Sequence, residues 1–244
     1  MSIPKVIHYC WFGGAEFPAL AKKCIASWKK HCPDYQIVCH NEDNFDINEN
    51  RYVREAYEAK KWAFVSDYVR LKVLYEQGGI YLDTDVEIIK PLDSLVKDGG
   101  YMGFDDCGLI STGLGFAAEK GNELVGAFLK DYEDIPFLLE DGSYDITPCP
   151  DRNTKTAIEL GLDTSVKDQF FMGIHILPED FLCPMKYYSG KKILTENTYS
   201  IHHFSASWTS AKSKRTIFMK RIIGVKLYKK LYGKFLYKTN WLEW

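Results

Sequence analysis

The sequence predicts an α/β fold in which a mostly parallel central sheet carries helices on both faces. Two observations support this prediction. Short apolar runs typical of buried strands alternate with segments whose apolar residues recur every three or four positions, as in parallel α/β sheets. The 244 residues are also 46% hydrophobic, which is enough to build a substantial core in one domain.

The first hundred residues contain the clearest elements. Four of them precede the most regular helix: strands at residues 5–12 and 35–39, and helices at residues 18–31 and 50–61. Residues 62–77 follow the helical period and end at Gly78-Gly79, a typical helix stop. A short apolar strand then begins at Ile80. Beyond Gly100 the pattern is less regular, and the predicted elements are helices at residues 122–132 and 154–160 and strands at residues 174–177 and 200–203.

The Ile80 strand leads directly into two carboxylates, because residues 78–87 read GGIYLDTDVE. Alternate residues of an extended backbone share a face, so Asp83 and Asp85 can converge on one point. Paired carboxylates at a strand end suit a hard divalent cation that also binds substrate phosphates. The alternative is that both aspartates are polar turn residues and that Glu87 faces solvent.

Three segments of the sequence form an ordered set. Residues 3–14 read IPKVIHYCWFGG, residues 63–85 read AFVSDYVRLKVLYEQGGIYLDTD, and residues 202–208 read HHFSASW. In this order they closely resemble the opening strand and loop, the D-x-D sugar-binding signature, and the late histidine and Ser-Trp segment of glycosyltransferase family 32. The matches extend over residues 3–208, which is most of the chain.

The resemblance implies the nucleotide-sugar-binding fold called GT-A and a metal-dependent, retaining transfer of a hexose-type sugar. The implied donor is a nucleotide-diphosphate sugar, with a UDP-sugar favoured, and the implied acceptor is a saccharide that is lipid-linked in cell-surface (capsule) polysaccharide synthesis. The implied cofactor is Mn²⁺ or Mg²⁺. Asp85 is the first ligand, Asp83 reaches the metal or the ribose, and His203 is the third ligand. His202 is the runner-up for this third ligand. Strand alternation directs one of the two histidines into the site and the other away from it.

Further roles come from the same resemblance. Asp67 and Arg70 match the positions that hold hydroxyls of the donor sugar, and with Asp83 and Asp85 they form the predicted catalytic set. Their alternative role is a structural ion pair, because they lie three residues apart on a helix.

The remaining donor contacts include one aromatic residue at the end of the first strand. Trp11 matches the aromatic residue that stacks on the nucleotide base, although it could be an ordinary core tryptophan. Tyr81 and Thr84 are assigned to donor binding, with Tyr81 near the ribose, and Ser207 and Trp208 match a lid over the diphosphate.

The chain departs from its relatives in two places. Residues 110–113, ISTG, stand where many relatives carry an asparagine near the donor phosphate or the acceptor. Residues 144–150 form a proline-containing loop that we expect on the acceptor side, without roles for its individual residues.

The net charge of −2 conceals a division of the chain. Residues 1–211, the predicted catalytic domain, contain 21 Lys and Arg against 32 Asp and Glu, whereas residues 212–244 contain 10 against 1. This basic extension also carries an apolar stripe at helical spacing, typical of an amphipathic helix on an anionic membrane surface. The alternative is a C-terminal helix packed on the domain. Nucleic acid is a less favoured partner, because the sequence contains no nucleic-acid-binding module.

The cysteines and the apolar runs bear on location. Seven cysteines without a C-x-x-C pair argue against a disulfide framework or a zinc site and favour buried thiols. No signal segment precedes the first strand, and no apolar run reaches the length of a membrane span. We therefore expect a cytoplasmic protein that associates peripherally with the inner face of the cell membrane.

Two other functions remain compatible with paired carboxylates and a histidine. One is a metal-dependent nucleotide hydrolase or nucleotidyltransferase, and the other is an inactive protein that binds sugar nucleotides.

Overall fold

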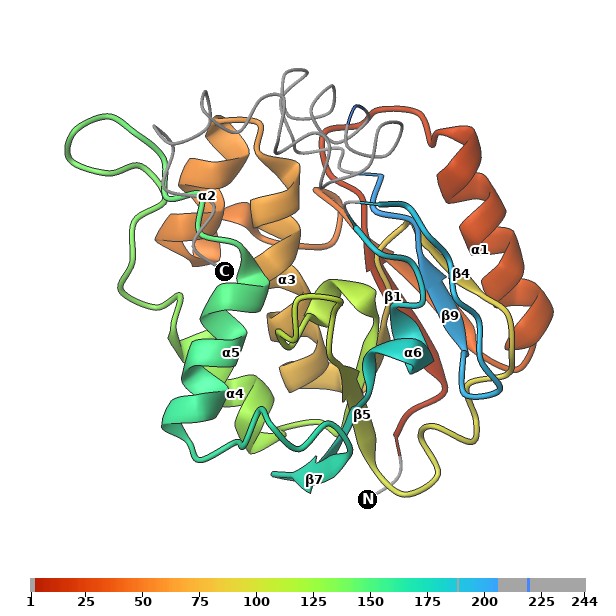
Figure 1. Cartoon of the computed structure of the whole chain (residues 1–244). Helices are drawn as coiled ribbons and strands as arrows, with labels where there is room; N and C mark the ends of the chain where they lie inside the picture. Colours follow the sequence, from red (N-terminus) through yellow and green to blue (C-terminus); the bar gives the residue numbers. More distant parts are fainter. Residues whose placement is uncertain (1–2, 188, 206–218, 220–244) are drawn as a thin grey trace.

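A seven-stranded sheet forms the centre of the computed structural model, which describes residues 3–187, 189–205 and 219 (Figure 1). Its strands, in spatial order, are β2 (Gln36–His40), β1 (Val6–Cys10), β3 (Gly79–Tyr81), β6 (Phe116–Ala118), β5 (Gly100–Gly103), β8 (Ile174–Leu177) and β7 (Gln169–Phe171). All strands except β6 and β7 run in the same direction. The predicted α/β class with a mainly parallel sheet is therefore confirmed.

The register of the first three strands positions two of the predicted site segments. In β1, Ile7 pairs with Ile80 of β3, and Cys10 pairs with His40 of β2. The N–H of Leu82 continues this pairing by donating to the His8 carbonyl at 3.0 Å. Because β1 and β3 are parallel, the residues that follow them, Trp11 and Asp83, leave the sheet at the same edge.

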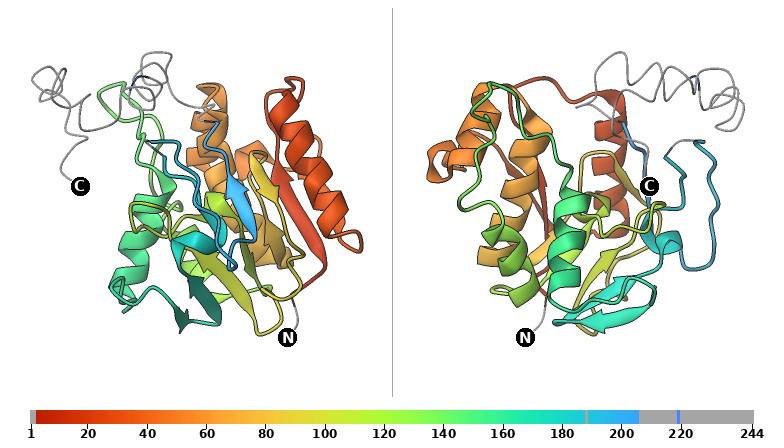
Figure 2. Two further views of the ribbon diagram at one scale, coloured as in Figure 1. Left: turned by 45° about the vertical axis from the view of Figure 1, so that its right-hand side comes forward. Right: turned by 60° about the vertical axis from the view of Figure 1, so that its left-hand side comes forward.

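Helices cover both faces of this sheet (Figure 2). One face carries α1 (Ala19–His31), α6 (Glu179–Leu182) and the two-stranded ribbon of β4 (Val86–Ile88) and β9 (Ser200–His202). The other face carries α2 (Arg51–Glu58), α3 (Trp62–Gln77), α4 (Glu123–Lys130) and α5 (Cys149–Glu159). Strand alternation supplies both layers, since Tyr81 packs with the second group and its neighbours Ile80 and Leu82 pack with the first.

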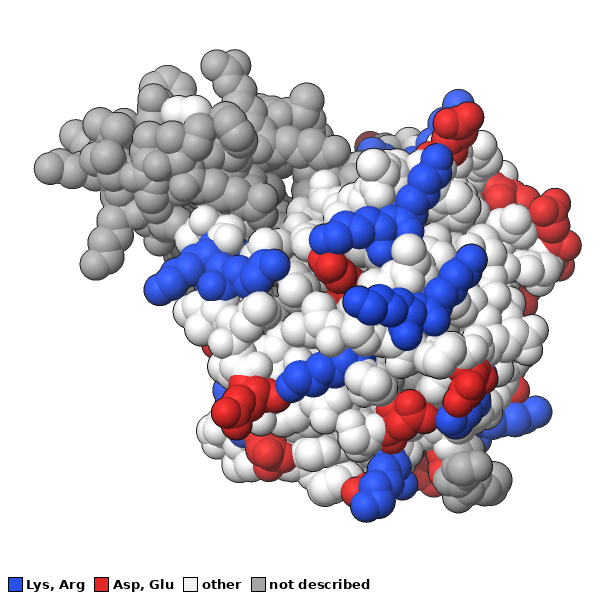
Figure 3. Space-filling view, turned by 90° about the vertical axis from the view of Figure 1, so that its right-hand side faces the viewer, with Lys and Arg blue, Asp and Glu red and all other residues white. Residues whose placement is uncertain are grey.

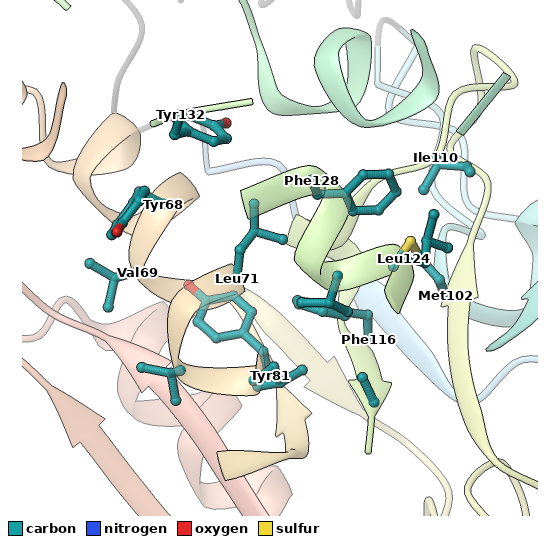
Figure 4. Packing of buried hydrophobic residues seen from close by; sticks show 14 of the residues in the cluster. Tyr68, Val69, Leu71, Tyr81, Met102, Ile110, Phe116, Leu124, Phe128 and Tyr132 are labelled. Atoms are coloured by element: carbon teal, nitrogen blue, oxygen red, sulfur yellow. The ribbon is translucent and has the colours of Figure 1, made fainter. Parts of the chain in front are cut away.

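The apolar core on the α3 side is built from large buried side chains. Leu71 of α3, Tyr81 of β3 and Phe128 of α4 belong to one cluster, which Figure 4 shows from close by. Helix α3 ends at Gly78, whose N–H bonds to the Leu74 carbonyl at 2.8 Å and whose φ is +70°. A Cβ at Gly78 would lie 2.8 Å from the backbone nitrogen of Lys120, so the turn from α3 into β3 requires glycine.

Most predicted elements occur close to their expected positions. The predictions for residues 62–77 and 174–177 match α3 and β8. Helix α5 begins five residues before the predicted start at 154, because Pro150 lies in its first turn, where a missing N–H is tolerated. Four short strands, β4, β5, β6 and β7, were not predicted, and neither were α6 and the 3₁₀ turns η1 (Ile47–Glu49) and η2 (Thr112–Leu114).

The predicted domain boundary after residue 211 and, apart from Met219, the basic extension fall outside the described residues. No helix among the described residues is long and apolar enough to cross a membrane.

Candidate active site

The D-x-D loop is held between the central sheet and the β4–β9 ribbon. It follows β3 directly, and a tight turn joins it to β4, with the Val86 N–H donating to the Asp83 carbonyl at 3.0 Å. Val86 pairs with His202 of β9, and the His203 N–H donates to the Asp85 carbonyl at 3.0 Å. These backbone bonds bring the histidine pair to the aspartates from 117 or more residues further along the chain.

Asp83, Asp85 and His202 converge in this loop. One ligand atom from each residue lies within 4.8 Å of the others. The His202 Nε2 atom is 3.2 Å from an Asp85 oxygen and 3.9 Å from an Asp83 oxygen. Two carboxylate oxygens and an imidazole nitrogen form a donor set that suits Mn²⁺ and is acceptable to Mg²⁺. The residues therefore fit the divalent cation that the sequence implies.

The prediction that His203 faces the aspartates is wrong, and the runner-up His202 takes that place. The His203 Nε2 atom instead lies 2.8 Å from Glu87 Oε2, which also accepts a hydrogen bond from Lys23 Nζ at 2.8 Å. Consecutive residues at a strand end point in opposite directions, and the pairing of β9 with β4 turns His202 inward.

A second polar group adjoins the first through Arg70. The Arg70 Nη2 atom is 2.9 Å from Asp67 Oδ1 and 3.2 Å from Asp83 Oδ1. Asp67 and Arg70 thus form the ion pair that was expected from the sequence as their alternative role. Arg70 also joins this pair to Asp83 of the D-x-D loop. Arg70 is 3% exposed and Asp67 is 8% exposed, so the group is largely enclosed.

Tyr81 contributes to this group differently from its predicted role near a ribose. Its side chain is buried, and its hydroxyl donates to Asp83 Oδ1 at 2.8 Å. Its ring lies 5.0 Å from the Arg70 guanidinium carbon. Tyr81 therefore orients Asp83 and Arg70 from the end of β3.

Neighbouring charges outweigh burial at His202 and Asp85, whereas burial outweighs them at Asp67. Burial alone would lower the pKa of His202, but the charge of Asp85 and hydrogen bonds to both aspartates raise it to about 10. Burial opposes ionisation of Asp85, yet His202 and the Ser205 N–H lower the pKa of Asp85 below its usual range. Burial raises the pKa of Asp67, and the Arg70 charge offsets this only in part.

The other predicted donor contacts lie at the same edge of the sheet or outside the described part. Trp11 follows β1, donates from Nε1 to the Ala15 carbonyl at 2.6 Å, and packs its ring 4.6 Å from that of Phe17. Thr84 is half-buried between the two aspartates. Ser207 and Trp208 lie outside the described residues, and the last described residue before them, Ser205, donates its N–H to Asp85 Oδ2 at 2.8 Å.

Two residues of this site had no predicted role. A Cβ at Gly113 would lie 2.7 Å from Asp83 Oδ2 and 3.1 Å from Arg70 Nη1, so the absence of a side chain there leaves room for both. Cys149, the first residue of α5, has its Sγ atom 3.7 Å from Arg70 Nη1 and from Thr112 Oγ1. The sequence signal for Gly113 was the departure of residues 110–113 from the expected asparagine, whereas nothing distinguished Cys149.

Comparison with known families agrees with this geometry. Residues 18–100 match the family described as "Glycosyltransferase sugar-binding region containing DXD motif". This match contains α3 and the D-x-D loop, but it ends well before His202.

Three curated relatives each match less than half of the chain. The initiation-specific α-1,6-mannosyltransferase of Saccharomyces cerevisiae is 30% identical over 103 residues, which are 38% of this chain and 22% of that protein. The inositol phosphoceramide mannosyltransferase 3 of Schizosaccharomyces pombe is 30% identical over 103 residues, 39% of this chain and 28% of that protein. The subversion of eukaryotic traffic protein A of Legionella pneumophila is 25% identical over 128 residues, 41% and 20% respectively. The chain thus covers less than a third of each relative.

Solved structures with a similar arrangement include a "PaToxG Glycosyltransferase" and the galactosyltransferase LgtC. The first has a TM-score of 0.46 and 20% identity, with 65% of this chain and 70% of that chain covered. The second has a TM-score of 0.42 and 12% identity, with 94% and 95% covered. These values are too low to equate individual residues.

The family match and the mannosyltransferase relatives agree with the resemblance that the sequence motifs predicted: residues 18–100 are similar to the DXD-containing sugar-binding region of glycosyltransferases.

Proposed function

We propose that this chain is a metal-dependent, retaining glycosyltransferase that moves a hexose-type sugar from a nucleoside-diphosphate sugar to a saccharide acceptor. The observation that carries the proposal is the convergence of Asp83, Asp85 and His202 beside the Asp67–Arg70 pair. The first group suits a cation that binds a diphosphate, and the second suits the hydroxyls of a sugar. Both lie in or next to the matched sugar-binding region.

Each polar group has a distinct task in this proposal. Asp85, Asp83 and His202 would hold Mn²⁺ or Mg²⁺, which when bound neutralises charge on the departing diphosphate. Asp67 would accept hydrogen bonds from sugar hydroxyls, and Arg70 would hold Asp67 and Asp83 at a fixed separation. Trp11 would stack on the base, and Ser207 and Trp208 would close over the diphosphate and limit hydrolysis.

The proposed reaction retains the anomeric configuration, as the family resemblance implies. The bond from the anomeric carbon to the phosphate oxygen breaks, and a bond to the acceptor oxygen forms on the same face. The departing phosphate oxygen takes the proton of the acceptor hydroxyl, so the step needs no covalent nucleophile. We favour UDP as the nucleoside diphosphate.

The place of action is a further part of the proposal. We infer a role in cell-surface polysaccharide synthesis with a lipid-linked acceptor at the cytoplasmic face of the membrane. The support is the basic, aromatic-rich composition of residues 212–244, with ten lysines and arginines against one acidic residue. The chain is expected to attach there peripherally.

Isothermal titration with UDP and GDP, with and without Mn²⁺, tests the proposal, followed by a screen of nucleotide sugars for transfer and hydrolysis. We expect Asp85→Asn to abolish Mn²⁺-dependent diphosphate binding and turnover while the melting temperature changes little. Asp93→Asn is the control, because Asp93 pairs with Lys5 at the surface, away from the site. Near-normal turnover of Asp85→Asn in chelator would refute metal dependence.

A further inference from the structure

Helix α1 presents a lysine-rich face to solvent on an otherwise acidic domain. Lys22, Lys23, Lys29 and Lys30 are all exposed, and no acidic residue lies between Ala19 and His31. The surrounding residues 1–211 carry 32 acidic against 21 basic side chains, so this helix reverses the local sign of charge. Figure 3, which looks onto the side of the molecule that carries α1, shows lysine and arginine side chains grouped near the middle of this face, with acidic side chains mainly along its edge and lower part.

Most of this charge is not neutralised by neighbouring carboxylates. Lys23 pairs with Glu87 at 2.8 Å, but within the described part of the chain Lys22, Lys29 and Lys30 form no ion pair. The positions repeat at intervals of seven, so Lys22 lies above Lys29 and Lys23 above Lys30 along the helix. The helix therefore fixes the backbone positions from which these charges extend, unlike a loop that could reorient.

The opposite face of α1 fixes the helix to β4, the strand that follows the D-x-D loop. Ala21, Cys24 and Trp28 are buried, and Trp28 Nε1 donates to the Val86 carbonyl at 2.7 Å. Val86 directly follows Asp85, so any surface that binds the lysine row is held at a defined distance from the candidate active site. A partner bound by α1 would therefore be positioned relative to the reaction centre.

Two observations identify the kind of partner. The row contains lysine and no arginine, and lysine acts as a strongly hydrated point charge suited to a diffuse layer of anions more than to bidentate recognition. In addition, the described chain reaches Ser205 against Asp85, and the basic residues 212–238 follow only seven positions later. The composition of residues 212–238 has the same sign of charge as the row, and both segments favour an extended anionic surface.

We propose that the lysine face of α1 is a membrane-contact surface that binds anionic lipid headgroups and orients the site toward a membrane-bound acceptor. The proposal rests on the membrane location proposed above and adds a folded element to it. Each basic residue near an anionic leaflet contributes about 1 kcal/mol, so removal of three charges should weaken binding roughly 100-fold at low salt.

Co-sedimentation with vesicles of phosphatidylglycerol and phosphatidylcholine tests this surface in the full-length chain. The test variant combines Lys22→Gln, Lys29→Gln and Lys30→Gln, and the matched control combines Lys120→Gln, Lys130→Gln and Lys155→Gln. The control lysines are exposed and belong to the side of the sheet covered by α3, α4 and α5. We expect roughly 100-fold weaker vesicle binding for the test variant and less than threefold change for the control, with donor hydrolysis in the absence of vesicles unchanged in both.

Equal vesicle binding by the two variants would overturn the proposal. Loss of binding to a duplex oligonucleotide without loss of vesicle binding would also overturn it, since the surface would then serve a nucleic acid. Vesicle binding is measured without nucleotide sugar. A chain that fails every transfer assay but shows lysine-dependent vesicle binding would therefore refute the proposed function and leave this surface supported.

Discussion

Two histidine sites, one in the first and one in the last of the three sequence motifs, have opposite electrostatics. His202 adjoins Asp83 and Asp85, and its pKa is raised to about 10. His8 in β1 adjoins His40 of β2, and its pKa is lowered to about 4 by burial and then by the charge of His40. Burial disfavours the charged imidazole in both places, so the neighbours decide the outcome.

The His8 site has the properties of a structural contact. Its Nε2 atom lies 3.1 Å from the Gly78 carbonyl, which can only accept, so Nε2 carries the proton. Its Nδ1 atom must then accept from His40 Nε2 at 3.0 Å. The neutral pair joins β1, β2 and the end of α3. His202 has carboxylates in place of a second histidine, so a cation that the carboxylates attract would displace the His202 proton to solvent and bind the neutral ring.

Replacement of each late histidine in turn tests whether His202 or His203 is the metal ligand, and it has the largest expected effect. His202→Ala should weaken Mn²⁺-dependent UDP binding by about 100-fold or more, because it removes a side chain proposed to bind the metal directly. Mutation of residues that only hydrogen-bond to metal ligands already lowers metal affinity by about 10–100-fold. His203→Ala removes only a contact to Glu87 and should change affinity less than about fivefold. Titration calorimetry on both variants checks this, and equal losses would contradict the selection of His202.

The pH dependence of the free energy of unfolding tests the His8 site. The folded pKa of His8 lies below the unfolded value of about 6.5, so the unfolded chain binds more protons between pH 6.5 and pH 4. Stability contributed by neutral His8 is therefore present above pH 6.5 and lost as pH falls toward 4, by about 2 kcal/mol at pH 5.

The variant His8→Gln removes this titration while it retains one donor and one acceptor. We expect it to be less stable than the parent at pH 7.5 but to lose less free energy of unfolding between pH 7.5 and pH 5. Urea unfolding at both pH values measures the difference. An unchanged pH slope would show that His8 is protonated as readily in the folded chain as in the unfolded one.

A glycine substitution probes how closely the carboxylate site is packed. Gly113→Ala would place a Cβ 2.7 Å from Asp83 Oδ2, and displacement of Asp83 should weaken Mn²⁺-dependent UDP binding by about tenfold. Gly126→Ala is the matched control, since its Cβ would lie 2.8 Å from Cε2 of the exposed Tyr75 ring, which can rotate away. Similar affinities for the two variants would show that Asp83 tolerates a shift.

Local patterns in the sequence predicted the parts of this comparison that depend on few residues. The period of residues 62–77 and the glycine stop predicted α3, and the alternation after Ile80 predicted that Asp83 and Asp85 converge. The choice between His202 and His203 could not be predicted, because it depends on the register of β9 with β4, more than 110 residues apart. The contacts of Gly113 and Cys149 depend on packing between segments that share no local pattern.

The smallest expected effect concerns the hydroxyl that fixes Asp83. Tyr81→Phe removes a hydrogen bond of 2.8 Å to Asp83 Oδ1 and keeps the ring against Arg70. The orientation of Asp83 should therefore lose about 1 kcal/mol of stabilisation. We expect UDP binding in Mn²⁺ to weaken about fivefold. Tyr101→Phe is a close control, because Tyr101 is equally buried and its hydroxyl has no hydrogen-bond partner among the described residues. It should leave affinity unchanged and should not reduce stability, since no bond is lost. If Tyr81→Phe also left affinity unchanged, Arg70 alone would suffice to hold Asp83, and the carboxylate site would owe its geometry to the ion pair and not to the buried tyrosine.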